Sequence, residues 1–265
     1  MTRAGALVRP LMLALLALAV VAPLALLVLT SFGEQWFFPS LWPAHLTLDG
    51  WRSVGGGRRT LARAAFTSAL LASLTGVLAT AVAFTLGRAL ATLTGWRRRL
   101  GTAMVFLPVA APPIAFGVGV QYSLLVAGLG GSFAGVLVAH LVPAVGFLSL
   151  YFLGVFSAFD LRIEDEARSL GATPRQTLWR ITLPMLRRQV AEAIVLGALI
   201  SWSQVALTQL IGGGLVRTLP LEVFAYVRSG QDRYAATGAL LLIIPALAAL
   251  AAMRVAARQA EVTPL

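Results

Sequence analysis

Residues Leu100–Phe159 read LGTAMVFLPVAAPPIAFGVGVQYSLLVAGLGGSFAGVLVAHLVPAVGFLSLYFLGVFSAF, and this stretch decides the class of the protein. It contains no Asp, Glu, Lys or Arg. A helix needs roughly 20 apolar residues to cross a bilayer, so the stretch is long enough for two crossings. The small turn Gly128-Leu129-Gly130-Gly131-Ser132 divides it, which predicts an antiparallel pair of helices over residues 100–127 and 133–156.

The composition of the whole chain agrees with this interpretation. The 265 residues are 58% hydrophobic and 12% charged, with a mean hydropathy of +0.85. A water-soluble domain carries about a quarter charged residues, so this chain has too little polar surface to be soluble. We therefore expect an all-α integral membrane protein with six transmembrane helices, forming a single domain over residues 1–265. The expected spans are residues 10–30, 64–87, 100–127, 133–156, 192–211 and 234–253.

The first apolar run has a positive flank and could be mistaken for a secretory signal peptide. A signal core is typically about 7 to 15 residues long and is followed by a small-residue cleavage site. The run Leu11–Leu29 is longer, and no such site follows it. We expect it to be retained as a membrane anchor.

The arginines set the expected orientation, because basic residues are retained on the cytoplasmic side during insertion. The segments expected inside carry twice as many arginines as those expected outside, which places both termini in the cytoplasm. The inside set is Arg3, Arg9, Arg88, Arg97, Arg98, Arg99, Arg162, Arg168, Arg175, Arg180, Arg187, Arg188, Arg254 and Arg258. The outside set is Arg52, Arg58, Arg59, Arg63, Arg217, Arg228 and Arg233.

Several functions are excluded by residue types. The net charge of +11 reflects arginines that flank apolar runs, where lipid headgroups rather than nucleic acid are the partner. The chain has no Cys, so it has no disulfide, no thiolate metal site and no Cys nucleophile. It has no Lys either, which removes the phosphate-binding loop of ATPases. We expect no metal and no cofactor bound by this chain.

The largest cytoplasmic segment, residues 160–190, predicts two short helices. Asp160 can cap the first, and Gly171 ends it, because glycine takes the left-handed conformation at little cost. Thr173-Pro174-Arg175-Gln176 has the pattern of a capping box with Pro at the first helical position. The second helix is expected to run to Ile181, and Pro184 to open the segment that leads into the fifth span. Capping alone is also compatible with a hairpin that merely rests on the membrane.

The spacing in this loop resembles the EAA motif of binding-protein-dependent ABC importer permeases. That motif reads E-A-A, three residues, Gly, nine residues, then I-x-L-P. The matching residues here are Asp165, Glu166, Ala167, Gly171, Ile181, Leu183 and Pro184. Asp165 replaces the usual Glu and keeps its carboxylate, whereas Glu166 replaces the first Ala with a larger, charged side chain, for which the neighbouring Glu164 can partly compensate.

The resemblance implies a type I importer permease fold in a bacterial or archaeal inner membrane, with a short cytoplasmic coupling helix after Gly171. It further implies an ABC ATPase in two copies, a second permease that by family habit is a different chain, and an extracytoplasmic substrate-binding protein. ATP and Mg would bind to the ATPase, and this chain would perform no covalent chemistry. The loop resembles permeases for spermidine/putrescine, iron, sulfate, thiamine and phosphonate more than sugar permeases. The sequence does not identify the solute.

Polar residues within the spans are candidates for the translocation path, since they are costly in lipid. Ser201, Gln204 and Thr208 are spaced to share one face of the fifth span. They can line the path or only bond to neighbouring helices. His140 in the fourth span and Gln121 in the third complete the candidate set; a lone membrane His is more often a packed group than a proton relay. Pro108, Pro112 and Pro113 are expected to kink the third span, and Pro220 to begin a short interfacial helix.

Two other functions are alternatives to an importer permease. An intramembrane serine protease would use His140 with a membrane Ser, but Gly130-Gly131-Ser132-Phe133 lacks the final Gly of the usual nucleophile setting. A self-contained secondary transporter would show inverted repeats and a charge near mid-membrane. In this chain the charges lie at the ends of the spans.

Overall fold

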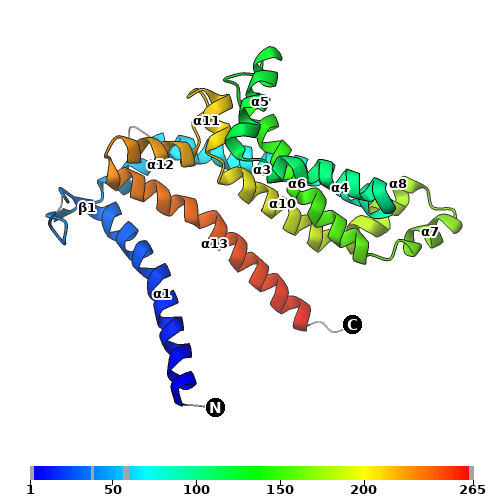
Figure 1. Ribbon diagram of the computed structural model, residues 1–265, viewed down its shortest axis with the longest axis horizontal. Coiled ribbons are helices and arrows are strands. Elements are labelled where there is room, and N and C mark those ends of the chain that lie inside the picture. The colour runs from blue at the N-terminus through cyan, green and yellow to red at the C-terminus, as the bar shows by residue number, and fades with distance from the viewer. Residues whose placement is uncertain (1–2, 37–38, 56–59, 263–265) are drawn as a thin grey trace. The chain divides into compact units, whose positions relative to one another are not determined.

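The computed structural model describes residues 3–36, 39–55 and 60–262, and the part it describes is helical apart from one pair of two-residue strands (Figure 1). The chain forms two compact units, one of residues 1–65 and 219–244 and the other of residues 66–218 and 245–265. Arg58 and Arg59, counted above among the outer arginines, lie outside the described residues. The same holds for the side chains of Arg3, Arg9 and Arg258.

Four of the described helices are long and apolar enough to cross a membrane. They are α1 (Arg3–Phe32) over Pro10–Phe32, α3 (Thr60–Thr92), α6 (Phe133–Ala158), and α13 (Asp232–Val262) over Asp232–Ala251. Two further spans are bent pairs of helices. The described chain therefore has four spans, or six if each bent pair counts as one.

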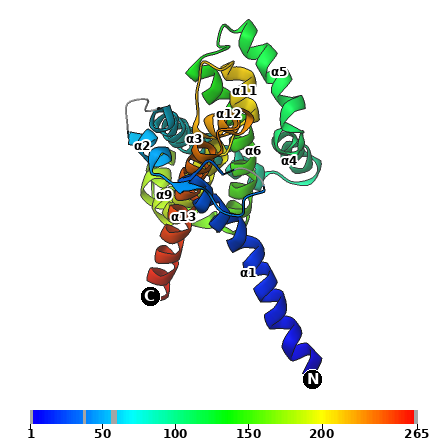
Figure 2. The ribbon, with the colours of Figure 1, turned by 90° about the vertical axis from the view of Figure 1, so that its left-hand side faces the viewer.

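The third span is broken rather than kinked. Helix α4 (Gly95–Ala110) and helix α5 (Pro113–Val126) meet at 97°, and Figure 2 shows α5 turning steeply away from α4. Ala111 and Pro112 between them are extended, with ψ of 140° and 129°. A residue that precedes a proline is pushed out of the helical region, and two prolines in succession apply this twice. The predicted bend in the third span is therefore present, but it is a break at Ala111 and Pro112, and Pro108 lies inside α4.

The fifth span is also broken, into α10 (Arg187–Trp202) and α11 (Ala206–Gly212), which meet at 64°. At the break the Ser203 hydroxyl donates to the carbonyls of Leu199 and Ile200, and the Gln204 N–H donates to the Ser201 carbonyl. Side-chain bonds of this kind compete with the helical ladder. The prediction of one continuous helical face over Ser201, Gln204 and Thr208 was therefore wrong.

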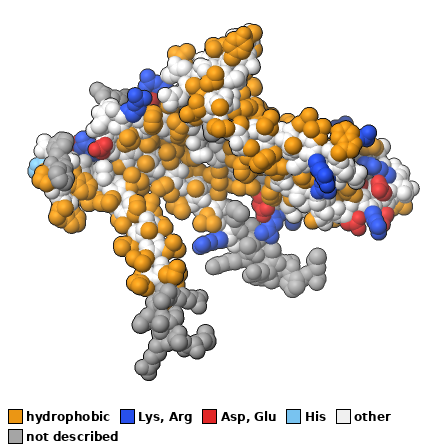
Figure 3. Space-filling model, viewed as in Figure 1, with side chains coloured by type: hydrophobic (Ala, Val, Ile, Leu, Met, Phe, Trp, Pro, Cys, Tyr) orange, Lys and Arg blue, Asp and Glu red, His pale blue; other side chains and the backbone are white. Residues whose placement is uncertain are grey.

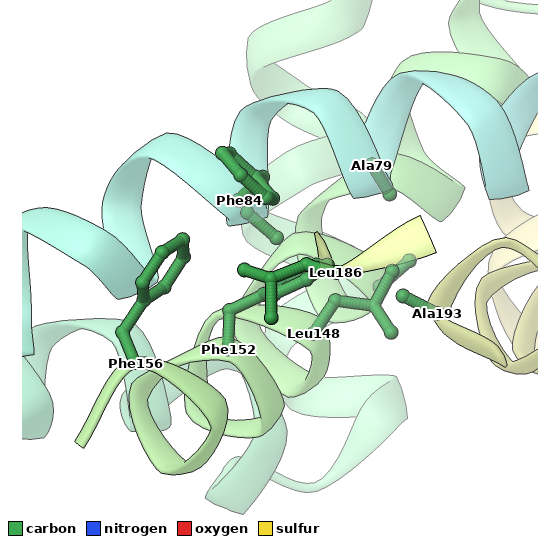
Figure 4. Packing of buried hydrophobic residues seen from close by; sticks show 9 residues of the cluster. Ala79, Phe84, Leu148, Phe152, Phe156, Leu186 and Ala193 are labelled. Carbon is green, nitrogen blue, oxygen red and sulfur yellow. The ribbon is translucent and has the colours of Figure 1, made fainter. Parts of the chain in front are cut away.

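In the second unit, α3, α6 and α10 share an aromatic core (Figure 4). The ring of Phe84 on α3 meets Phe152 and Phe156 of α6 edge-on, with centroid distances of 5.2 and 5.0 Å. Gly87 lies against Phe152, and a Cβ at that position would collide with it. Small residues let membrane helices approach closely in this way. The result is a tightly packed base for the segment that follows α6.

That segment contains α7 (Arg162–Ser169), α8 (Pro174–Thr177), the π-helical turn η1 (Leu178–Thr182) and α9 (Leu183–Met185). On the face shown in Figure 3, apolar side chains cover the helices of the second unit, and Arg, Asp and Glu gather at the end that carries α7 and α8. This separation of apolar and charged surface is typical of a membrane protein, whose charged side chains lie outside the hydrocarbon layer.

The first unit holds a strand pair and two short helices. Strand β1 (Gly33–Glu34) pairs antiparallel with β2 (His45–Leu46), and α2 (Asp49–Gly55) follows. Arg233 at the start of α13 lies 3.6 Å from Glu34 and 4.0 Å from Asp49. Helix α12 (Leu219–Arg228) begins at the position predicted from Pro220.

Candidate functional site

The loop between α6 and α10 begins with a helix that is fixed at both ends. The Asp160 carboxylate accepts the Arg162 N–H at 3.0 Å, which satisfies a free donor at the start of α7. Gly171 ends α7 with φ of +91°, and its N–H donates to the Arg168 carbonyl at 2.9 Å. The Ala172 N–H reaches back to Ala167 at 3.0 Å, which completes a Schellman motif. The predicted end of this helix is confirmed.

The second helix of the loop begins with the predicted capping box. The Gln176 N–H donates to the Thr173 hydroxyl at 3.3 Å, and the Thr173 N–H donates to the Gln176 side-chain carbonyl at 2.8 Å. Pro174 holds the first helical position. These reciprocal bonds satisfy donors that a helix start otherwise leaves free.

The π turn η1 carries the second helix to Thr182, one residue past the predicted end at Ile181, and Pro184 lies at the start of the next element, α9, as predicted. The chain widens into a π turn in which the Leu183 N–H donates to the Leu178 carbonyl, and helical structure continues to Met185. Proline is tolerated in a first helical turn because a backbone N–H at that position would have no partner within the helix. Leu186, with φ of −98° and ψ of 13°, separates α9 from α10.

This second helix presents an exposed surface of mixed character. Trp179 is 63% exposed, and Thr173, Arg175, Gln176 and Arg180 line a hollow with it. Leu170, just before Gly171, is 90% exposed. Large exposed apolar side chains among charged ones are typical of a surface that a protein partner or the membrane covers.

The carboxylates of the loop divide between its two sides. Asp165 and Glu166, which the motif alignment singled out, are both exposed. Glu164 is buried instead, with contacts to Arg88 of α3 and Thr182 of η1. Glu164, Arg88 and Thr182 could not be recognised as a site from the sequence, because their contacts join positions 18 and 76 residues apart.

Within the spans, His140 of α6 bonds to both sides of the fifth-span bend. Its Nδ1 lies 2.8 Å from the Ser201 hydroxyl on α10, and its Nε2 lies 3.0 Å from the Thr208 hydroxyl on α11. Thr208 uses its own proton to donate to the Gln204 carbonyl at 3.0 Å. The Thr208 oxygen must then accept from Nε2–H, which leaves Nδ1 to accept from Ser201. This hydrogen-bond pattern is compatible with the Nε2–H tautomer of His140.

The hydrogen-bonded pair of His140 and Ser201 has the atoms of a serine-histidine dyad, which bears on the protease alternative. His140 is 1% exposed and Ser201 is 4% exposed. A nucleophile needs room for the reacting carbonyl about 3 Å away. In this structure the Ser201 hydroxyl is closed off from any substrate, so the geometry supports a helix-to-helix tie.

Gln121 and Gln204 lie in different environments. Gln121 donates to the Leu210 carbonyl at 2.9 Å, and so satisfies one of the free carbonyls at the end of α11. Gln204 lines a pocket of about 220 Å³ together with Ser203. The other residues of this pocket come from both broken spans and from α6: Pro108, Val109, Ala111, Phe116, Pro143, Phe147, Ile200 and Leu207. Of the five predicted path residues, Gln204 lines this pocket, and the other four are held in bonds between helices.

A second carboxylate that was not predicted as a site residue lies near the start of α10. Glu192 accepts from the Tyr151 hydroxyl of α6 at 2.8 Å and from Arg188 at 3.0 Å. Its side chain is 28% exposed. No group of three or more His, Cys, Asp or Glu residues is placed to hold a metal ion within the described chain.

Comparison with known proteins gives a family for this arrangement. Residues 83–261 match the model of the "Binding-protein-dependent transport system inner membrane component" family. The chain is 31% identical over 229 residues to the putative 2-aminoethylphosphonate permease PhnV of Salmonella typhimurium, covering 84% of this chain and 82% of that one. It is 26% identical over 189 residues to the spermidine/putrescine permease PotC of Haemophilus influenzae, covering 71% and 74%. It is 33% identical over 162 residues to the molybdenum permease ModB of Mycobacterium bovis, covering 56% and 61%.

The fold has a counterpart among solved structures. A bacterial ABC transporter that imports the acidic polysaccharide alginate matches 96% of this chain and 98% of its own, with a TM-score of 0.67 and 16% identity. The family match covers more than half of the residues, and it includes the whole loop from Asp160 to Gln189. The chain therefore belongs to the family of binding-protein-dependent inner-membrane transport components, and it is the permease component of an ABC importer.

Proposed function

We propose that this permease couples ATP hydrolysis on a separate subunit to solute passage, and that the α8–α9 segment is its cytoplasmic coupling helix. The observation that carries the proposal is the capped, exposed helix that begins at Thr173 and presents Trp179 between arginines. Such a surface suits a groove on a cytoplasmic ATPase. ATP and Mg then bind to two ATPase copies, and this chain receives the motion that follows.

The transmembrane arrangement proposed here has six spans in one permease domain, with both termini in the cytoplasm. Four long helices and two bent pairs supply the spans. The arginine distribution supports the orientation.

The translocation path is proposed to pass the pocket at Gln204. Both broken spans contribute to this pocket. Discontinuous helices are tolerated at membrane depth where their free backbone groups face a cavity, and they are a common site of solute contact in transporters. His140, Ser201, Thr208 and Gln121 then hold the walls of the path rather than touch the solute.

A second permease and a binding protein complete the proposed importer. The apolar side chains of α1 from Leu11 to Val28 are largely exposed within this chain, so lipid or a second permease, here proposed as a different chain, would cover them. The related alginate transporter was solved with a periplasmic protein that binds alginate pentasaccharide. An extracytoplasmic binding protein would likewise deliver a small solute to this chain.

Affinity purification from native membranes in mild detergent, followed by mass spectrometry, tests the assembly. We expect a phosphate-loop ATPase and a second permease to accompany the chain. Recovery of the chain alone, where a known transporter complex from the same membranes stays intact, would overturn the proposal.

A further inference from the structure

The described loop between α6 and α10, which runs from Asp160 to Leu186 and is called the coupling segment below, has its most buried carboxylate at Glu164. It lies on α7 and is 2% exposed, whereas its neighbours Asp165 and Glu166 face solvent. A buried charge is costly unless it is paired and hydrogen-bonded. The buried Glu164 carboxylate therefore needs contacts that offset this cost.

Three partners from three segments meet the Glu164 carboxylate. Arg88, near the end of α3, bonds to Oε2. Thr182, in the π turn η1, donates to Oε1 at 2.8 Å and is itself fully buried. Arg168, one turn further along α7, lies 3.6 Å from Oε2. One carboxylate therefore joins a spanning helix to both helices of the loop.

The α3 end of this junction is rigid. Gly87, beside Arg88, packs directly against Phe152 of α6, and Phe84 lies between Phe152 and Phe156. Packed interiors do not deform continuously, so a push on one element moves its neighbours as a body. Charged hydrogen bonds are the strongest links available at such a junction.

We infer that Glu164 is a positioning residue that ties the coupling segment to α3, so that displacement of the segment moves the spanning helices instead of bending the loop. This inference rests on the proposed function, because it assigns the path by which motion of the coupling helix enters the membrane. The tie is distinct from the exposed motif residues Asp165 and Glu166, which remain free to face a partner.

The test uses the full importer reconstituted with its ATPase, partner permease and binding protein. In Glu164→Gln the side chain keeps its shape and loses its charge. We expect the ATPase to stay bound while the solute taken up per ATP hydrolysed falls about tenfold, the size that corresponds to loss of one charged hydrogen bond. Arg162→Gln removes an exposed charge from the same helix and should leave this ratio unchanged.

A charge exchange separates a tie from general destabilisation. Arg88→Glu alone should uncouple, and the double variant Arg88→Glu with Glu164→Arg should regain part of the coupling. Thr182→Val, which keeps the charge pair, should give a smaller loss. Equal coupling in Glu164→Gln and in the unaltered importer would overturn the inference and leave the proposed function standing. An unaltered permease that binds no ATPase would overturn both.

A distance measurement reports the relative motion of α3 and α7 directly, independently of the solute taken up per ATP hydrolysed. Spin labels on Thr92→Cys at the end of α3 and Ser169→Cys on α7 fall on exposed positions of a chain without native Cys. We expect one distance distribution through the ATP cycle, because the two elements move together. In Glu164→Gln the distribution should broaden or shift on ATP binding. An unchanged distribution in that variant would contradict the tie.

Discussion

The Nε2 atom of His140 on α6 lies 3.0 Å from the Thr208 hydroxyl on α11, while Nδ1 of the same ring lies 2.8 Å from Ser201 on α10. One buried side chain thus holds the two halves of the broken fifth span. Hydrogen bonds between membrane helices contribute about 0.6 kcal/mol each on average, because the alternative state also finds partners. The main effect of these two hydrogen bonds is on geometry. They hold α10 and α11 at their angle, and so set the position of the pocket residue Gln204 between the two helices.

Replacement of His140 by Ala should loosen the bend. The buried Ser201 hydroxyl would lose the ring nitrogen that it contacts, at about 1–3 kcal/mol for a group left unsatisfied, while Thr208 would keep its bond to the Gln204 carbonyl. We expect a lower thermal midpoint for the detergent-purified protein. Tyr122→Phe, at an exposed position on α5, is the matched control. Equal midpoints for His140→Ala and the control would contradict this role of His140.

Replacement of Gly171 by Val should disturb the coupling loop without affecting insertion. Gly171 has φ of +91°, where a β-branched residue is strained by about 1–3 kcal/mol. The end of α7 would shift, and uptake would be uncoupled from ATP hydrolysis or the ATPase would fail to dock. Uptake and ATPase retention in proteoliposomes measure this. Gly154→Ala, where an added Cβ meets nothing within 4 Å, serves as control, and full uptake in Gly171→Val would exclude the coupling assignment.

Replacement of Gln204 by Ala tests the path. The side chain lines the pocket where the two broken spans meet, so its loss should remove a polar contact to the solute of about 1 kcal/mol. We expect the rate of uptake to fall about fivefold while assembly with the ATPase is retained. Gln209→Ala alters an exposed residue on α11 and should have no such effect. The same small effect from both variants would place the path elsewhere.

The orientation can be checked by labelling single cysteines, since the chain has none of its own. We expect Ser169→Cys in α7 to react with a membrane-impermeant reagent only from the cytoplasmic side, and Ser40→Cys only from outside. Both side chains are exposed. Reaction of Ser40→Cys from the cytoplasmic side would reverse the orientation derived from the arginines.

The features that the sequence predicted well are local ones. The end of α7 at Gly171 and the capping box at Thr173 depend on residues within five positions of each other. The long spans follow from uncharged runs of about 20 residues, because the bilayer imposes that length on any crossing. These signals do not depend on how the rest of the chain packs.

The features that the sequence did not predict depend on distant partners. The fifth-span bend contains neither Gly nor Pro, and it is stabilised by bonds from Ser203 and by His140 on another helix. Glu164 could be distinguished from Asp165 only through its contact with Arg88 on α3. The prolines of the third span did mark their break, although the 97° angle exceeds an ordinary kink.

Cross-linking from the coupling helix tests the central claim most directly. A single Trp179→Cys, placed in the otherwise Cys-free chain and treated with a short cross-linker in native membranes, should form an adduct with the ATPase subunit. Leu215→Cys, at a position that is more exposed than Trp179 but lies in the segment expected outside, should form none. An adduct from Trp179→Cys alone is the predicted result. Absence of that adduct in an importer that still hydrolyses ATP, or equal adducts from both positions, would contradict the account.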